Sequence, residues 1–251
     1  MDEASKTERI RGPEFSDQYF SGKVLDIGCG DNLVVPNAIP FDKEQGDAQN
    51  ILNYLKPNDF DCVHSSHSLE HMRDVPKALE QWWQLVKPGG VMVIVVPDED
   101  LYEQGVWPSL FNRDHSATFR LNKPDSWSPV SYDLGKLCSA LEDAEVVSLE
   151  RQDMGYDHTL KSHGLGRQGK FFMRLNRSII KRLNRNKEDL TKLGLNIQLL
   201  KYKVNLISVK LGALIDQTLE DAVVQIQIIL RKKKQKSNTY FSFGNLVGFF
   251  I

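Results

Sequence analysis

Short apolar runs alternate with amphipathic segments along residues 20–150 of the chain. Apolar runs typical of strands buried on both faces of a sheet occur at residues 23–27, 38–41, 60–65 and 91–96. Between the last two, residues 74–86 carry apolar side chains at helical spacing, with Asp74 as candidate N-cap and Pro76 in the first turn. The alternation predicts an α/β fold with a doubly wound, mostly parallel sheet.

The rest of the chain adds weaker elements. A short helix is expected at residues 14–19, within a polar lead-in, and a longer one at residues 131–144. Strands are expected at residues 146–150 and 222–230, the second of which completes the sheet. Residues 97–129 form a long loop rich in polar and aromatic side chains, which predicts a substrate wall or lid.

Charge is distributed unevenly, although the net charge is only -1. Residues 161–210 hold 13 Lys and Arg side chains against Glu188 and Asp189, and predict two basic helices broken near Gly194. We therefore expect a core at residues 1–158, a basic helical insertion at 159–214, the last core strand at 215–232 and a basic, then apolar tail at 233–251. The insertion suits a membrane surface, an oligomer contact or a solvated face, and nucleic acid is disfavoured because no stacking platform accompanies the charges.

Cysteine usage and the N-terminus favour the cytoplasm. The three cysteines lie far apart and without metal-type spacing, which argues against disulfides. The N-terminal residues are charged and contain no apolar stretch of the secretory type. We expect a cytoplasmic protein, with peripheral attachment to the inner membrane face as the alternative if the insertion contacts lipid.

Closely spaced glycines follow the first strand. Gly28, Cys29 and Gly30 come directly after the apolar run, and glycine lets backbone N–H groups approach a ligand closely. Asp42 stands at the end of the next strand, where an acid commonly holds a ribose diol. These positions predict a nucleoside-cofactor site.

An ordered series of motifs extends this interpretation. VLDIGCG at residues 24–30 is followed by GDA at 46–48, FDCV at 60–63, SSHSLEH at 65–71, LVKPGG at 85–90 and VVP at 95–97. The series resembles class I S-adenosylmethionine-dependent methyltransferases. The resemblance implies a Rossmann-like sheet of seven strands and S-adenosylmethionine as cofactor. The chain departs from the pattern after Gly30, where the usual helix is shortened and Asp31 or Asn32 replaces a third glycine.

The resemblance implies a role for each cofactor-site residue. Gly28, Cys29 and Gly30 would contact the methionine part, and Asp26 its amino group. The remaining assignments are Asp42, with Lys43 beside it, for the ribose, Asp47 and Ala48 for adenine, and Ser66 and His67 near the sulfonium. Structural alternatives stay open: a turn with a structural Asp26, a solvated Asp42, and Asp47 as the N-cap of a following helix.

A narrower resemblance concerns the acceptor. DEDLYEQ at residues 98–104, WPS at 107–109, FNRDH at 111–115 and DQTLEDA at 216–222 are similar to bacterial methyltransferase-domain proteins of surface-polysaccharide biosynthesis. This resemblance implies O-methylation of a sugar hydroxyl on a small-molecule or glycan acceptor. The alternatives are a small metabolite, a lipid-linked intermediate, or a non-catalytic cofactor-binding scaffold in a glycan-assembly complex.

A hydroxyl acceptor needs a base whose pKa lies near neutrality, and histidine is the first choice. We expect His115 to be this base, followed by Asp98 and then His67, although His115 could instead hold the loop in place. Trp107, Phe111 and Trp127 could stack on a sugar or form a small core. A metal interpretation of His64, His67, Glu70 and His71 is also open, but their spacing is irregular and we expect no metal.

Overall fold

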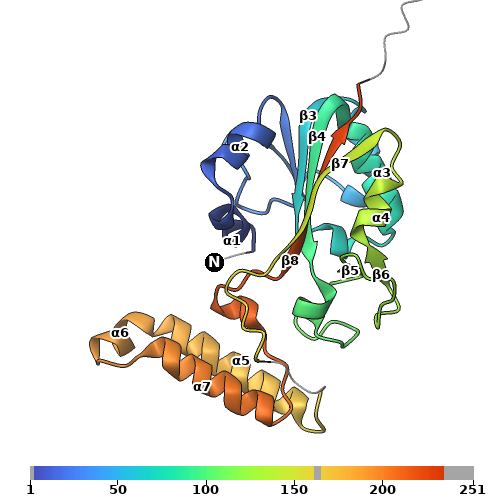
Figure 1. Cartoon of the computed structure of the whole chain (residues 1–251). Helices are drawn as coiled ribbons and strands as arrows, with labels where there is room; N and C mark the ends of the chain where they lie inside the picture. Colours follow the sequence, from blue (N-terminus) through green and yellow to red (C-terminus); the bar gives the residue numbers. More distant parts are fainter. Residues whose placement is uncertain (1–2, 161–164, 235–251) are drawn as a thin grey trace, which may run out of the picture.

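The computed structural model describes residues 3–160 and 165–234 and has a six-stranded sheet at its centre (Figure 1). In sheet order the strands are β2 (Ile39–Phe41), β1 (Val24–Ile27), β3 (Phe60–Ser66), β4 (Val86–Pro97), β8 (Gln225–Lys232) and β7 (Ala144–Gln152). The first four are mutually parallel, and β8 runs antiparallel to both of its neighbours. The predicted α/β class with a mostly parallel sheet is confirmed.

The expectation of seven strands is wrong by one. No strand forms between β2 and β3, a segment that the structure describes in full. The chain turns after β2 and enters the short 3-10 helix η1 (Ala48–Asn53), which is capped by the side chain of Asp47. Polar residues 43–47 and this early cap leave no extended apolar run to join the sheet edge.

Helices cover both faces of the sheet (Figure 1). One face carries α3 (Val75–Leu85) and α4 (Leu134–Ser139), and the other carries α1 (Glu3–Ile10) and α2 (Pro13–Tyr19). Asp74 caps α3 by accepting a hydrogen bond from Lys77 N at 3.1 Å, as predicted. The sequence did not indicate α1, and the helix expected at residues 131–144 is reduced to α4.

The core on the α3 side is built from the apolar runs of the strands. Leu25 of β1, Val63 of β3, Ile94 of β4 and Ile228 of β8 come from four adjacent strands and are fully buried. Trp82 of α3 packs against them, and its indole Nε1 donates to the carbonyl of Ala48 at 2.8 Å. Burial of these side chains fixes the carboxyl ends of β1, β3 and β4 next to one another.

The long loop after β4 is ordered around one buried carboxylate. It contains the π-helical turn η3 (Glu99–Glu103) and the strand β5 (Thr118–Arg120), which pairs with β6 (Ser131–Asp133). Glu99 is 1% exposed and accepts hydrogen bonds from Thr118, Ser126 and Ser131. Lys123 Nζ approaches it to 3.1 Å. These contacts give the loop a defined shape.

Three α-helices, two of them basic, lie between β7 and β8 in the described part of the sequence. They are α5 (Gly169–Arg185), α6 (Lys187–Lys192) and α7 (Ile197–Lys210), one more than predicted, because the chain breaks at Asn186 as well as at the predicted Gly194. Figure 1 shows α5 and α7 side by side beyond the lower end of the sheet. Asn176 of α5 donates to Asn205 and Ser208 of α7 in their buried interface. Within the described residues, no helix combines the length and apolarity needed to cross a membrane. The predicted apolar tail at residues 240–251 lies outside the described part.

Replacing Glu99 by alanine is expected to lower the free energy of unfolding by about 3 kcal/mol, because buried hydroxyl donors and Lys123 lose their acceptor. Urea unfolding followed by circular dichroism measures this change. The matched control is Asp125→Ala in the same loop, where the exposed side chain should contribute less than about 0.5 kcal/mol. Equal stability of the two variants would contradict the role given to Glu99.

Candidate active site

Gly28 makes the sharpest turn at the end of β1. Its φ is +74°, and a Cβ atom at this position would lie 1.8 Å from Ser68 Oγ. Only glycine fits without moving the segment after β3. Two cavities open on either side of this residue, and both are lined partly by Gly28.

The larger of these cavities has a volume of 740 Å³ and lies at the carboxyl ends of β1 and β2. Asp42, Lys43, Asp47 and Ala48, the four residues expected at the nucleoside, all line it. Asp42 accepts hydrogen bonds from Gly30 N at 2.9 Å and from Lys43 N at 2.7 Å. The carboxylate is therefore held rigidly at the cavity wall, where a ribose diol could donate to its remaining lone pairs.

Asp47 both caps the helix η1 and lines the larger cavity. It caps η1 by accepting from Gln49 N at 3.0 Å, and Arg73 Nη2 donates to it at 2.8 Å. The hydrogen bond from Arg73 is the main cause that lowers the pKa of Asp47. Asp47 is thus the N-cap of η1, which was the structural alternative for this residue, and it still lines the cavity.

The smaller cavity, of 270 Å³, is lined by the residues expected at the methionine part together with two residues of α1. The expected residues are Asp26, Gly28 and Cys29, joined by Ser66, which is expected near the sulfonium, and those of α1 are Ser5 and Glu8. Burial raises the pKa of the Cys29 thiol, which keeps it protonated. Gly30 is exposed and does not line this cavity, although its N–H is bound by Asp42.

Asp26 is buried and both of its oxygens have partners. Val34 N donates to one oxygen at 2.7 Å, and His64 Nδ1 lies 2.7 Å from the other. Arg11, which can only donate, lies 3.3 Å from His64 Nε2, so Nδ1 carries the hydrogen that His64 gives to Asp26. Asp26 therefore has a structural role and can contact an amino group only through remaining lone pairs. Sequence reasoning missed Arg11 and the covering helix α1.

Three histidines and two glutamates meet where β3 and β4 end. His67, which has φ of +54°, turns the chain into η2 (Leu69–His71) and lies next to Glu70. His115 from the long loop reaches the same place, and its Nδ1 lies 2.7 Å from Glu103 Oε1. The structure thus brings together His67 and His115, two of the three expected bases, although they are far apart in sequence.

Burial shifts the titration of this group. It lowers the pKa of His67 to about 4 and raises the pKa of Glu70 to about 7. His67 is therefore neutral at physiological pH, and its Nε2 lies 3.0 Å from Gln225 Oε1. A neutral imidazole at the carboxyl ends of the strands can accept a proton or bind an electrophile.

The expectation that Asp98 could act as a base is not supported by its surroundings. The side chain is fully buried, and one oxygen caps η3 by accepting from Asp100 N and Leu101 N. Arg151 Nε donates to the other oxygen at 2.8 Å. An ion pair and two cap bonds leave Asp98 as an anchor of the loop.

A third cavity, of 510 Å³, separates the long loop from the inserted helices. Its wall is mostly polar and includes Lys6, Tyr102, Phe111, Asn112, Arg177, Asn184 and Asp216. Tyr102 also stacks against His115 with ring centroids 5.2 Å apart, so this cavity borders the histidine group. Of the three aromatic residues expected at a sugar, Phe111 lines the cavity, whereas Trp127 is bound to Asp100 and Trp107 lies elsewhere in the loop.

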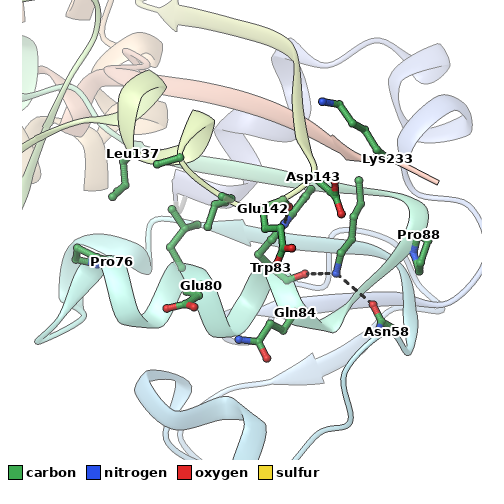
Figure 2. Close-up of a pocket in the computed structure, with 14 residues that line it drawn as sticks. Asn58, Pro76, Glu80, Trp83, Gln84, Pro88, Leu137, Glu142, Asp143 and Lys233 are labelled. Carbon is green, nitrogen blue, oxygen red and sulfur yellow. Dashed lines mark hydrogen bonds between the residues drawn. The ribbon is translucent and has the colours of Figure 1, made fainter. Parts of the chain in front are cut away.

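A further cavity of 730 Å³ lies at the opposite end of the sheet (Figure 2). It is lined by α3 from Pro76 to Gln84, by residues 137–143 and by Lys232, whose Nζ donates to Asn58 and to the carbonyl of Trp83. None of the expected site residues reaches it. Ligands of doubly wound sheets bind at the carboxyl ends of the strands, and this cavity is at the amino ends.

Comparison with known proteins gives one family match. Residues 7–127 match the family model described as a methyltransferase domain. No curated protein matches the chain. Among solved structures, an S-adenosylmethionine-dependent methyltransferase from Archaeoglobus fulgidus aligns at 14% identity and a TM-score of 0.45, covering 91% of this chain and 94% of that one.

A second solved structure is phosphoethanolamine N-methyltransferase 2 from Haemonchus contortus, in complex with phosphomonomethylethanolamine and S-adenosylhomocysteine. It aligns at 13% identity and a TM-score of 0.40, over 92% of this chain and 52% of that one. Neither likeness is close enough to bear on the acceptor. The match of residues 7–127 identifies a methyltransferase domain, and the protein is an enzyme that uses S-adenosylmethionine as its methyl donor.

Proposed function

We propose that the protein methylates a hydroxyl group of a sugar or glycan acceptor during bacterial surface-glycan biosynthesis. The observation that carries the proposal is the polar cavity of 510 Å³ lined by Tyr102, whose ring packs against that of His115. Its wall combines aromatic faces (Tyr102, Phe111) with amide and carboxylate groups (Asn112, Asn184, Asp216), which suits a polyhydroxylated ligand.

Two cations favour an acceptor that also carries phosphate. Lys6 and Arg177 line the same cavity, in which the Arg177 guanidinium lies 3.5 Å from the Asp216 carboxylate. Guanidinium groups bind phosphate oxygens well because their donors lie in one plane. Nucleotide-linked and lipid-linked sugars both present such oxygens next to their hydroxyl groups.

The two cavities that share Gly28 suit the methyl donor, with adenosine beside Asp42 and Asp47 and the methionine part beside Asp26 and Ser66. When bound, S-adenosylmethionine supplies an electrophilic methyl group, and the electron pair of the broken C–S bond returns to sulfur. Because the donor is already activated, the protein mainly has to orient the two reactants.

His115 is the group we assign to the acceptor hydroxyl. Glu103 holds its Nδ1, which leaves Nε2 with the electron pair that can accept the hydroxyl proton while the oxygen bonds to the methyl carbon. His67 is the second candidate, since it is neutral and lies in the same group. Both assignments are inferences from placement in the fold.

A lipid-linked acceptor is the second candidate, and the inserted helices favour it. We propose that residues 159–214 are an accessory insertion to a core formed by residues 1–158 and 215–232. Helix α5 exposes Phe171, Leu175 and Ile179 on one side, next to basic residues such as Arg174 and Arg182. An apolar stripe edged by cations is typical of helices that lie on anionic lipid, while a contact between two copies of the chain is the alternative.

Asp42→Ala is expected to weaken binding of S-adenosylmethionine by about 10- to 100-fold, because a charged acceptor of ribose hydrogen bonds contributes about 1.5–3 kcal/mol. Isothermal titration calorimetry measures the dissociation constant. Glu44→Ala is the matched control, since this exposed neighbour does not line the cavity and should bind as the wild type does. Unchanged affinity in Asp42→Ala would remove Asp42 from the cofactor site.

His115→Ala is expected to reduce kcat by about 10²- to 10⁴-fold at saturating cofactor, the usual contribution of general acid–base catalysis. The assay follows labelled methyl transfer into a panel of nucleotide-sugars and lipid-linked glycans. His158→Ala, which alters an exposed histidine paired with Asp153, should retain wild-type turnover. Near-normal turnover in His115→Ala, or no sugar methylated by the wild type, would contradict the proposal.

The double variant Phe171→Glu/Leu175→Glu is expected to bind anionic phospholipid vesicles at least about tenfold more weakly, since two apolar side chains no longer enter the lipid. Cosedimentation with phosphatidylglycerol vesicles measures binding, and pure phosphatidylcholine vesicles test the charge requirement. Met154→Glu changes an exposed apolar residue outside the insertion and serves as control. Equal binding by both variants would contradict a lipid contact through α5.

A further inference from the structure

Three side chains that commonly bind metals converge at the active site. Glu70 and His71 end η2, and His115 comes from the long loop. One ligand atom from each lies within 4.8 Å of the other two. Glu70 is 1% exposed and His115 is 8% exposed, whereas the side chain of His71 is 31% exposed, so the group is buried except on the side of His71.

Hydrogen bonds fix the tautomers of His71 and His115. His71 Nδ1 lies 3.0 Å from the carbonyl oxygen of Asp114, and His115 Nδ1 lies 2.7 Å from Glu103 Oε1. A carbonyl and a carboxylate only accept hydrogen bonds, so both Nδ1 atoms carry the hydrogen. The Nε2 atom of each ring therefore presents an electron pair.

A chain of side-chain amides fixes His67 in the same way. Glu150 accepts from Gln152 Nε2 at 2.7 Å, and Gln152 Oε1 accepts from Gln225 Nε2 at 2.7 Å. Gln225 therefore turns its oxygen toward His67, whose Nε2 must donate across 3.0 Å. The electron pair of His67 Nδ1 then faces Glu70 Oε1 at 3.7 Å.

Glu70 Oε1 thus faces the electron pair of His67 Nδ1. Its Oε2 is buried without a hydrogen-bond partner in the described part of the chain. His71 Nε2 lies 3.9 Å from Glu70 Oε1, which is beyond hydrogen-bonding distance. Buried carboxylates in such surroundings require either a proton of their own or a cation.

We propose that Glu70, His71 and His115 bind a divalent transition-metal ion. Two imidazoles and one carboxylate are the donors that Zn²⁺, Mn²⁺ and Fe²⁺ accept, and three protein ligands leave a position for substrate. With ligand distances of about 2.1 Å, tetrahedral ligands lie about 3.4 Å apart, so small side-chain rotations close the site. Glu103 and the Asp114 carbonyl orient the two rings, as outer partners of metal-binding histidines do.

The role of the ion rests on the function proposed above. An acceptor hydroxyl that coordinates the ion loses its proton more readily. In that case the proton passes to solvent, the oxygen forms the bond to the methyl carbon, and the C–S electron pair returns to sulfur. His115 then activates the hydroxyl through the ion instead of accepting the proton itself.

The test measures metal binding without any acceptor. Tag-free protein is stripped with a chelator, dialysed and titrated with Co²⁺ alone, followed by calorimetry and by visible absorption. We expect one equivalent of Co²⁺ to bind with ligand-field bands that Zn²⁺ abolishes on displacement. His71→Ala/His115→Ala should lose this binding, while His158→Ala should retain it.

A second variant keeps the test valid if the double alanine variant misfolds. Glu103→Gln keeps the side-chain shape and is expected to weaken Co²⁺ binding by about 10- to 100-fold, the usual effect of removing an outer partner. The proposal is overturned if the wild type binds no stoichiometric Co²⁺, which would indicate a protonated Glu70, or if wild type and both variants bind equally.

The same stripped protein separates this inference from the proposed function. Full methyl transfer to a sugar by chelator-treated enzyme, unchanged by added Mn²⁺ or Zn²⁺, would overturn the metal site and leave the function standing. Stoichiometric Co²⁺ binding without transfer to any hydroxylated acceptor would support the metal site and contradict the function.

Discussion

A buried chain of amide hydrogen bonds joins the last two strands to the active site, and the arrangement of the site depends on it. Gln225 of β8 donates to Gln152 of β7, and its oxygen accepts from His67 and from Thr7 of α1. Two residues further along β8, Gln227 accepts from Arg11 at 2.9 Å. Buried polar groups of this kind specify one arrangement because each must find its partner. Strand β8 therefore holds both the covering helix α1 and the ring of His67.

This constraint explains how the enzyme tolerates the inserted helices. The chain leaves the sheet after β7 and returns at β8, and these two strands pair along their whole length. The insertion is fastened to the core by Arg177, which lies 3.5 Å from Asp216, and by Asn184, which donates to the Leu219 carbonyl at 2.8 Å. The helices can thus form one wall of the cavity of 510 Å³ without disturbing the sheet.

The sequence predicted those elements whose signals lie within a few neighbouring residues. The strand ending at Gly28, the cap at Asp74, the loss of the helix after Gly30 and the break at Gly194 all have nearby sequence signatures. The helix at residues 131–144 was overestimated, because its apolar spacing continues beyond the point where α4 ends.

The contacts that assemble the site are long-range and could not be read from spacing. His64 pairs with Asp26 and Arg11 with Gln227, and no periodicity indicates either pair. The convergence of His115 with Glu70 requires the loop to fold back onto η2, where Ser116 N donates to the Glu70 carbonyl at 2.7 Å. The shape of the loop in turn depends on the buried Glu99. For the same reason the irregular spacing of the histidines argued against a metal, although the folded chain brings suitable donors together.

In the proposed complex the methyl donor lies across Gly28, with its sulfur toward the histidine group. A crystal structure of the complex with S-adenosylhomocysteine tests this most directly. It should show the ribose hydroxyls on Asp42, the amino acid part beside Asp26 and Ser66, and the sulfur facing His67 and His115. A ligand bound elsewhere, such as in the cavity of Figure 2 at the amino ends of the strands, or a sulfur directed away from these histidines, would contradict the account.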